Sequence, residues 1–358
     1  MRAAPAVLLS VLSVLLAGLP ARAASADPPP PSDLTGFTEE ITVALSTVTV
    51  RVVDTLGNPV TGLGPQDFRV RIGRRETPVA AVDWFSSDEE RTVPALSSEP
   101  DAGPAETPWS SGQLVVFFVQ ADLNPTRISG QLRLRPYTRE LLDRLHPNDR
   151  VAVVSYDSHL KLWQDFTRDR GAVYAALDRA MVWTEEEALE KDGKDERPSL
   201  MPGFDAVAAR RAASPERALE VTARALAALP GEKVIVYLGW GLGRYTSSGV
   251  QMTPAYGPAV RALAAAHASV FVLDVTSADF HSLEVGLQAV AAATGGTYAK
   301  TNVLPGLATD ALARTLTGYY VLTLDCGEAE GAKGEVRVDL RGRKGTVLVR
   351  PVRVRPKN

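Results

Sequence analysis

The chain has 358 residues, of which 45% are hydrophobic and 23% are charged, a composition typical of a folded protein with more than one domain. Its formal net charge of -3 excludes a general electrostatic attraction to nucleic acid or to an anionic membrane. The single cysteine, Cys326, excludes an internal disulfide and a zinc site built from several cysteines.

Residues 1–26 are predicted to be an export signal. Arg2 precedes an apolar stretch at residues 6–19, and the small residues at 21–26 offer cleavage sites of the A-x-A form. The apolar stretch is shorter than the roughly 20 residues that a membrane-spanning helix needs, which argues against an anchor. No later segment is apolar enough to span a bilayer, so we expect a protein exported to the periplasm or the cell exterior.

A proline-rich linker at residues 27–40 is expected to lead into a small antiparallel β unit at residues 41–86. Residues 47–54 and 68–73 alternate apolar and polar side chains and are separated by Gly, Pro and Asn turns. Residues 87–112 are rich in Ser, Pro and acidic side chains, which indicates a second linker.

Residues 113–317 follow a different pattern and predict an α/β domain. Nearly continuous apolar strands alternate with Ala- and Leu-rich helical stretches, which indicates a doubly wound, mostly parallel sheet covered on both faces. The main strands are expected at residues 113–121, 150–157, 232–239 and 269–276. An acidic insert at 184–199 is expected to be a solvated loop.

Residues 318–358 return to β alternation and are predicted to pair with residues 41–86 in a small sandwich-like unit. The four histidines are scattered along the chain without the spacing of metal ligands. A histidine-based metal site is therefore not expected from the sequence.

The segment YLGWGLGRY at residues 237–245 follows a buried strand and raises the question of a ligand. A dinucleotide fingerprint requires Gly-x-Gly-x-x-Gly opening into a helix, but Arg244 takes the third place and a loop is expected after it. The sequence also lacks a phosphate-binding P-loop and a Gly-x-Ser-x-Gly nucleophile motif. We expect no catalytic centre, with an enzyme that binds a phosphate-bearing ligand as a remote alternative.

Three stretches resemble the von Willebrand factor type A family, in particular its bacterial exported proteins. The first is residues 50–85, which include DTLGNPVTGLGPQDFRV, and the second is residues 145–177, which include LHPNDRVAVVSYDSHLKLWQDF. The third is GYYVLTL at 318–324 with the basic strands that follow. The resemblance touches nearly the whole mature chain. It implies a Rossmann-like α/β domain inserted between β segments, with a role in binding another protein or the cell envelope.

The family commonly binds Mg²⁺ or Mn²⁺ through Asp, Ser and Thr side chains on three loops at the carboxyl edge of the sheet. In this sequence each loop departs from that pattern. The first loop offers only Asp122 and Asn124, the second places Met201 near the expected Thr, and the third has Trp240 where an Asp is expected. The resemblance therefore implies a degenerate metal site and a domain without bound metal.

An exposed Trp240 could anchor a protein partner, because tryptophan is frequent among interface hot spots. The predicted partner-binding residues are Gly239, Trp240, Gly241, Leu242 and Arg244. The opposing interpretation is that Trp240 folds inward and fills the volume of the lost ion.

An alternative function keeps a divalent metal for adhesion. The ligands would then be Asp122 and Asn124, with Asp157 or Asp205. Helix capping is the competing interpretation for Asp122, Asn124 and Asp205, and Asn124-Pro125 is a natural helix start.

Overall fold

A computed structural model describes residues 45–86, 112–122, 124–181, 198–325, 334–350 and 353–354. These residues belong to one compact unit, 42–358. The predictions for the export signal, the linkers at 27–40 and 87–111, most of the acidic insert and Cys326 lie outside the described residues. None of the helices described is both long enough and apolar enough to cross a membrane.

A six-stranded sheet forms the centre of the α/β part, in the order β12-β11-β8-β5-β6-β7. The edge strand β7 runs antiparallel to β6, and the other neighbours are parallel. The predicted mostly parallel α/β sheet is therefore confirmed. Its strands are β5 (Leu114–Gln120), β6 (Arg150–Tyr156), β7 (Leu160–Thr167), β8 (Lys233–Gly239), β11 (Ala268–Asp274) and β12 (Tyr298–Lys300).

The chain reverses its direction of winding between β5 and β8. From β5 it builds outward to β6 and β7, and it then returns to the other side of β5 to add β8, β11 and β12. In open α/β sheets, ligands bind in the crevice outside the carboxyl ends of the strands at such a switch point. The ends of β5 and β8 are therefore the first place to look for a site.

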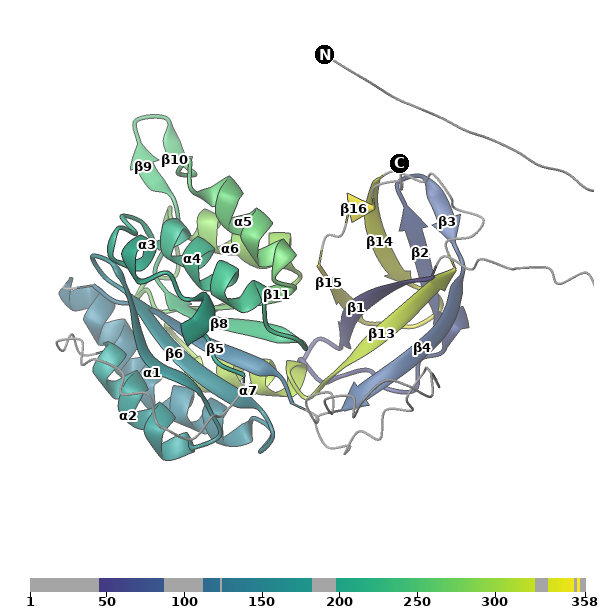
Figure 1. The fold of residues 1–358 in the computed structure, drawn as a ribbon, viewed down its shortest axis with the longest axis horizontal. Helices are drawn as coiled ribbons and strands as arrows, with labels where there is room; N and C mark the ends of the chain where they lie inside the picture. Colours follow the sequence, from purple (N-terminus) through teal and green to yellow (C-terminus); the bar gives the residue numbers. More distant parts are fainter. Residues whose placement is uncertain are drawn as a thin grey trace, which may run out of the picture. The chain divides into compact units, whose positions relative to one another are not determined.

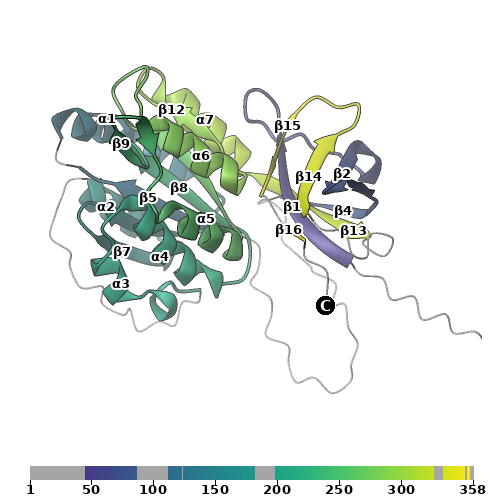
Figure 2. The same ribbon diagram turned by 90° about the horizontal axis from the view of Figure 1, so that it is seen from above.

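Helices cover both faces of this sheet, as Figures 1 and 2 show. The side chains of β5 are buried along its whole length and alternate between the two helical layers, so that Phe117 joins one layer and Phe118 the other. One layer contains α1 (Pro125–Arg144), α2 (Arg170–Met181) and α7 (Pro305–Thr315). The other contains α3 (Ala206–Arg210), α4 (Pro215–Ala227), α5 (Tyr256–Ala265) and α6 (Glu284–Thr294).

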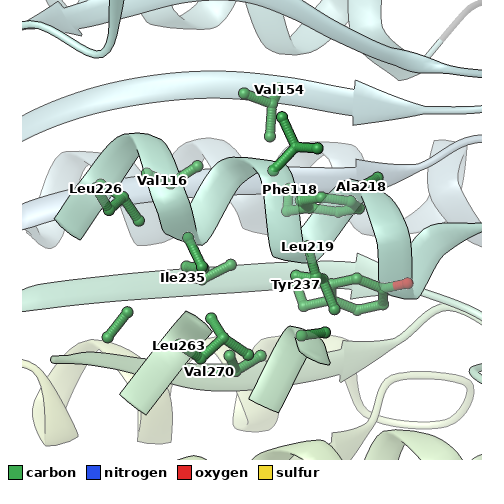
Figure 3. Close-up of a cluster of buried hydrophobic side chains, with 14 of the residues drawn as sticks. Val116, Phe118, Val154, Ala218, Leu219, Leu226, Ile235, Tyr237, Leu263 and Val270 are labelled. Carbon is green, nitrogen blue, oxygen red and sulfur yellow. The ribbon is translucent and has the colours of Figure 1, made fainter. Parts of the chain in front are cut away.

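Figure 3 shows the core between the sheet and this second layer. Leu219 and Leu226 of α4 lie over the central strands. The rings of Phe118 and Tyr237 stack with centroids 5.0 Å apart and an interplanar angle of 18°. The Tyr237 hydroxyl is buried and has no hydrogen-bond partner among the described residues. Burial, with a contribution from the nearby Glu216 carboxylate, raises the pKa of Tyr237 well above its ordinary value.

The remaining strands form two four-stranded antiparallel sheets, ordered β15-β1-β13-β4 and β16-β14-β2-β3. Both sheets contribute to one buried cluster, in which Val50 of β1 lies opposite Tyr320 of β13. The predicted pairing of N-terminal with C-terminal strands is confirmed. The strands are β1 (Leu45–Val53), β2 (Phe68–Ile72), β3 (Arg75–Thr77), β4 (Val79–Ser86), β13 (Gly318–Asp325), β14 (Gly334–Leu340), β15 (Thr346–Val349) and β16 (Arg353–Val354).

The loop expected after residue 244 is instead a small hairpin. Strands β9 (Arg244–Thr246) and β10 (Gly249–Gln251) pair antiparallel. The Thr246 hydroxyl donates a hydrogen bond of 2.7 Å to the Gly249 carbonyl, and Gly249 has a φ of 106°, which favours glycine. The expectation of an irregular loop was wrong because a tight turn with one glycine is enough to pair two very short strands.

Candidate functional site

Gln120 connects the two strand ends that flank the switch point. It is the last residue of β5, and its side chain is fully buried. Its Oε1 accepts hydrogen bonds from the backbone N–H groups of Trp240 at 3.0 Å and Gly241 at 3.2 Å. Its Nε2 donates to the Gly241 carbonyl at 2.9 Å. One side chain therefore satisfies three backbone groups of the loop that follows β8.

Beside Gln120, an arginine from the next helix lies between a carboxylate and an indole. Arg127, in the first turn of α1, forms an ion pair with Asp122. Its guanidinium carbon lies 3.3 Å from the centre of the Trp240 ring. Arginine is charged at any ordinary pH, and an aromatic face attracts a cation. The chain thus places a guanidinium cation between the Asp122 carboxylate and the Trp240 ring at the end of β5.

Trp240 itself is half-buried and packs against the core layer that contains α1. Its Nε1 is buried and has no acceptor among the described residues. The ring is therefore partly enclosed by the core and partly exposed to solvent, between the exposed anchor and the inward-packed residue that the sequence allowed.

The other predicted partner-binding residues divide into two groups. Gly239, Gly241 and Leu242 are buried, which corrects the expectation that this loop offers them to a partner. Arg244 is exposed at the start of the β9–β10 hairpin. Tyr245 beside it has 72% of its surface exposed and was not singled out in the sequence. Of the five predicted partner-binding residues, Arg244 in the hairpin is therefore the one classed as exposed.

Two of the possible metal ligands cap helices. The Asn124 Oδ1 accepts a hydrogen bond of 3.0 Å from the Thr126 N–H at the start of α1. Asp205 caps α3 in the same way, with its Oδ1 2.9 Å from the Ala208 nitrogen. The capping interpretation is confirmed for both. Asp122 does not cap α1 but accepts a hydrogen bond of 2.9 Å from the backbone N–H of the cap residue, Asn124.

Asp157 is held within the turn between β6 and β7. Its Oδ2 lies 2.6 Å from the Lys161 ammonium, and Ser158 also donates to the carboxylate. Burial alone would raise the pKa of Asp157, but the bonds from Lys161 and Ser158 outweigh it and lower this pKa. Each of the four candidate metal ligands thus has another structural partner.

The two helix caps provide a test of these roles. Replacing Asn124 with alanine should lower the free energy of unfolding by about 1 kcal/mol in metal-free buffer, because an N–H at the start of α1 loses its acceptor. Asp205→Ala is the matched control cap and should lose a similar amount. Chemical denaturation measures both. A loss for Asn124→Ala that appears only when Mg²⁺ or Mn²⁺ is present would contradict the capping role.

The second loop of the expected metal site, at Met201, lies against the edge strand β7. Met201 begins the short helix η2 (Met201–Gly203), and the Asp165 carboxylate of edge strand β7 accepts a hydrogen bond of 2.8 Å from the Leu200 N–H. A second side chain that reaches the loop after β8, besides that of Gln120, is that of Glu216, whose Oε1 accepts a bond of 2.6 Å from the Gly243 N–H. The signal for it was the helix start at Ser214-Pro215-Glu216.

A second cluster at the carboxyl edge was missed in the sequence. Asp274 ends β11, and His281 and Glu284 stand three residues apart at the start of α6. Among the residues described, these three form the one group of three His, Cys, Asp or Glu side chains with ligand atoms within 4.8 Å of one another. The spacing His281-x-x-Glu284, shortly after a strand that ends in Asp, was the available signal.

Hydrogen bonds and an ion pair join this cluster to its surroundings. The Asp274 Oδ2 lies 2.6 Å from the His281 Nε2 and accepts a bond of 2.7 Å from the Tyr298 hydroxyl. The Lys300 ammonium lies 2.8 Å from the Glu284 Oε2. Burial, followed by the bond to Asp274, raises the pKa of Tyr298, which keeps this hydroxyl protonated.

No family model matches the sequence, and no curated protein matches it. Among solved structures, the chain is similar to BatB from Bacteroides thetaiotaomicron, with a TM-score of 0.34 and 14% identity over 56% of this chain and 98% of that one. It is also similar to a von Willebrand factor type A protein from Catenulispora acidiphila, with a TM-score of 0.38 and 10% identity over 88% and 73% of the two chains. The chain is also similar to the three N-terminal domains of the type V pili tip protein Mfa5 from Porphyromonas gingivalis. The TM-score is 0.38 and the sequence identity is 11%, over 69% of this chain and 57% of that one. Likenesses with TM-scores this low assign neither a family nor a function to the chain.

Proposed function

We propose that this chain is an exported, non-enzymatic protein that binds another protein or a component of the cell envelope. Its binding element would be a type A α/β domain without Mg²⁺ or Mn²⁺ at the switch point, supported by the two antiparallel sheets as a sandwich-like unit. The sequence resemblance suggests the domain type, and the winding order β12-β11-β8-β5-β6-β7 agrees with a doubly wound domain.

The observation that carries this proposal is the position of Arg127. A divalent cation at the end of β5 would need the Asp122 carboxylate, but Arg127 already neutralises it and is itself stacked on Trp240. Asn124 is occupied at the helix start, and the indole of Trp240 offers no oxygen ligand. The Arg127 guanidinium would thus supply the positive charge beside Asp122 that a bound metal ion would otherwise supply.

The proposed contact surface is the β9–β10 hairpin that follows the Trp240 loop. It presents Arg244 and Tyr245, and both residue types are enriched at the energetic centres of protein interfaces. The buried loop before it, fixed by Gln120 and Glu216, would hold the hairpin in place.

Calorimetric titration of Mg²⁺ and Mn²⁺ into the metal-stripped mature protein tests the first part of the proposal. We expect no saturable heat that depends on Asp122. Asp122→Ala and His281→Ala are compared, so that binding at the Asp274 cluster is not mistaken for binding at the switch point. Saturable binding that Asp122→Ala removes and His281→Ala leaves unchanged would favour metal-dependent adhesion instead.

Site-specific photo-crosslinking tests the second part. A photoreactive residue is placed at position 245, and the matched control is at Leu56, which is 64% exposed within the antiparallel β region. We expect a discrete crosslinked envelope partner from position 245 only. The double variant Arg244→Ala, Tyr245→Ala should weaken binding of that partner by about tenfold or more. Equal crosslinking from both positions, or unchanged binding by the double variant, would contradict the proposed surface.

A further inference from the structure

The cluster of Asp274, His281 and Glu284 lies one strand away from the switch point. Asp274 is the register partner of Gly239 in the parallel pairing of β11 with β8. His281 and Glu284 belong to the segment that packs on the loop after β8, where a Cβ on Gly241 would meet Leu283 at 2.6 Å. The three side chains therefore converge from the end of one strand and the start of one helix.

Burial makes this cluster different from an ordinary group of surface acids. The side chains of Asp274 and Glu284 are 2% and 7% exposed, whereas the His281 side chain retains 16% exposure. Two carboxylates removed from water need a nearby cation. The Glu284 Oε2 receives no hydrogen bond of good geometry from the described residues, although the Lys300 ammonium lies 2.8 Å away.

The donor set matches a borderline transition metal better than Mg²⁺ or Ca²⁺. An imidazole nitrogen with two carboxylates suits Zn²⁺, while the hard cations prefer oxygen ligands alone. Zn²⁺ holds nitrogen and oxygen donors at about 2.0 to 2.2 Å, so its ligand atoms lie about 3.3 Å apart in a tetrahedron. One ligand atom of each residue already lies within 4.8 Å of the others, close to that spacing.

We propose that Asp274, His281 and Glu284 bind a divalent transition-metal ion of the Zn²⁺ class, with Lys300 as the competing internal cation. The ion would take the place of the proton between the His281 Nε2 and the Asp274 Oδ2, which are 2.6 Å apart, and this proton would be released to solvent. The Lys300 ammonium would leave Glu284 and keep its bond to the Asp279 carbonyl. The His281 imidazole, 16% exposed, would give the ion an entry path.

Titration of ZnCl₂ into the metal-stripped, untagged mature protein tests the proposal, with heat and thermal shift as readouts. We expect one saturable site in the wild-type chain, weakened by about 100-fold or more in His281→Ala, because losing a ligand costs at least as much as losing an outer partner. Glu284→Gln preserves the shape of the side chain and should weaken binding in the same way if His281→Ala does not fold.

Lys300→Met distinguishes a metal site from a structural ion-pair network. Removing the competing charge should tighten Zn²⁺ binding by about tenfold or more, because the ammonium repels the incoming ion at close range. Lys161→Met is the matched control, since it removes a lysine from the Asp157 carboxylate elsewhere in the chain. It should leave Zn²⁺ binding unchanged.

Two results would overturn the proposal. The first is an absence of saturable Zn²⁺ binding in both the wild-type chain and Lys300→Met. The second is binding that His281→Ala and Glu284→Gln leave unaltered. This inference is independent of the proposed partner surface, because the titration measures cation binding alone and can fail while crosslinking at position 245 succeeds.

Discussion

Replacing Glu232 with alanine is expected to lower the free energy of unfolding by about 3 to 5 kcal/mol. The Glu232 Oε1 accepts bonds from Arg51 at 3.0 Å and from Arg350 at 2.9 Å. All three residues are at most 9% exposed. Without the carboxylate, two buried guanidinium groups lose their shared counter-ion and have little access to water. Urea denaturation monitored by circular dichroism measures the loss in the free energy of unfolding.

The surroundings of this cluster explain why the loss should be large. Arg51 lies on β1, Glu232 directly precedes β8, and Arg350 directly follows β15, so the cluster joins strands that are far apart in sequence. Arg51 also donates to the Gln113 side chain at 2.6 Å, and Arg350 donates to the His267 carbonyl at 2.7 Å. These bonds fix both guanidinium groups in place and limit their movement toward solvent.

Glu76→Ala is the matched control for this prediction. Glu76 also pairs with two arginines, Arg69 and Arg341, but its side chain is 42% exposed. Exposed ion pairs contribute about 0 to 1 kcal/mol, because water replaces the lost partner. If Glu76→Ala and Glu232→Ala shift the unfolding midpoint equally, burial does not determine how much the ion pairs of Glu232 stabilise the folded protein.

The arrangement of the sheet was predictable because its signals are local. β5 contains no charged side chain and is buried along its whole length, which requires helices on both faces. Asn124 followed by Pro125 marks the start of α1 with equal clarity. The β9–β10 hairpin was missed because its strands have three residues each, too short for an alternating pattern to be visible.

The contacts of the candidate site were less predictable because they join residues far apart in sequence. Gly239 and Gly241 were predicted to contact a partner, yet the space beside them is filled by the Tyr237 ring and by Leu283. They are glycines because side chains would collide there. The partnership of Gln120 with Trp240 spans 120 residues, and nothing local in either segment indicates it.

Gln120→Leu is expected to lower the free energy of unfolding by about 3 to 5 kcal/mol, the second large effect. Leucine has a similar volume, so the change leaves little cavity, but it removes the partners of the Trp240 N–H, the Gly241 N–H and the Gly241 carbonyl. A buried polar group without a partner costs about 1 to 3 kcal/mol. The total should be smaller than the sum of three separate costs, because the three groups are neighbours and relax together.

Hydrogen exchange should show where Gln120→Leu acts. The amides of Trp240 and Gly241 should lose protection more than those of the central strands, because their acceptor is the substituted side chain. Gln251→Leu is the matched control, since Gln251 is exposed and its side chain donates to the exposed Ser248 hydroxyl at 3.1 Å. It should change the unfolding free energy by no more than about 0.5 kcal/mol. Equal unfolding midpoints for the two variants would mean that the loop after β8 does not depend on Gln120, and its rigidity would then have to come from Glu216 and the packing of Leu242.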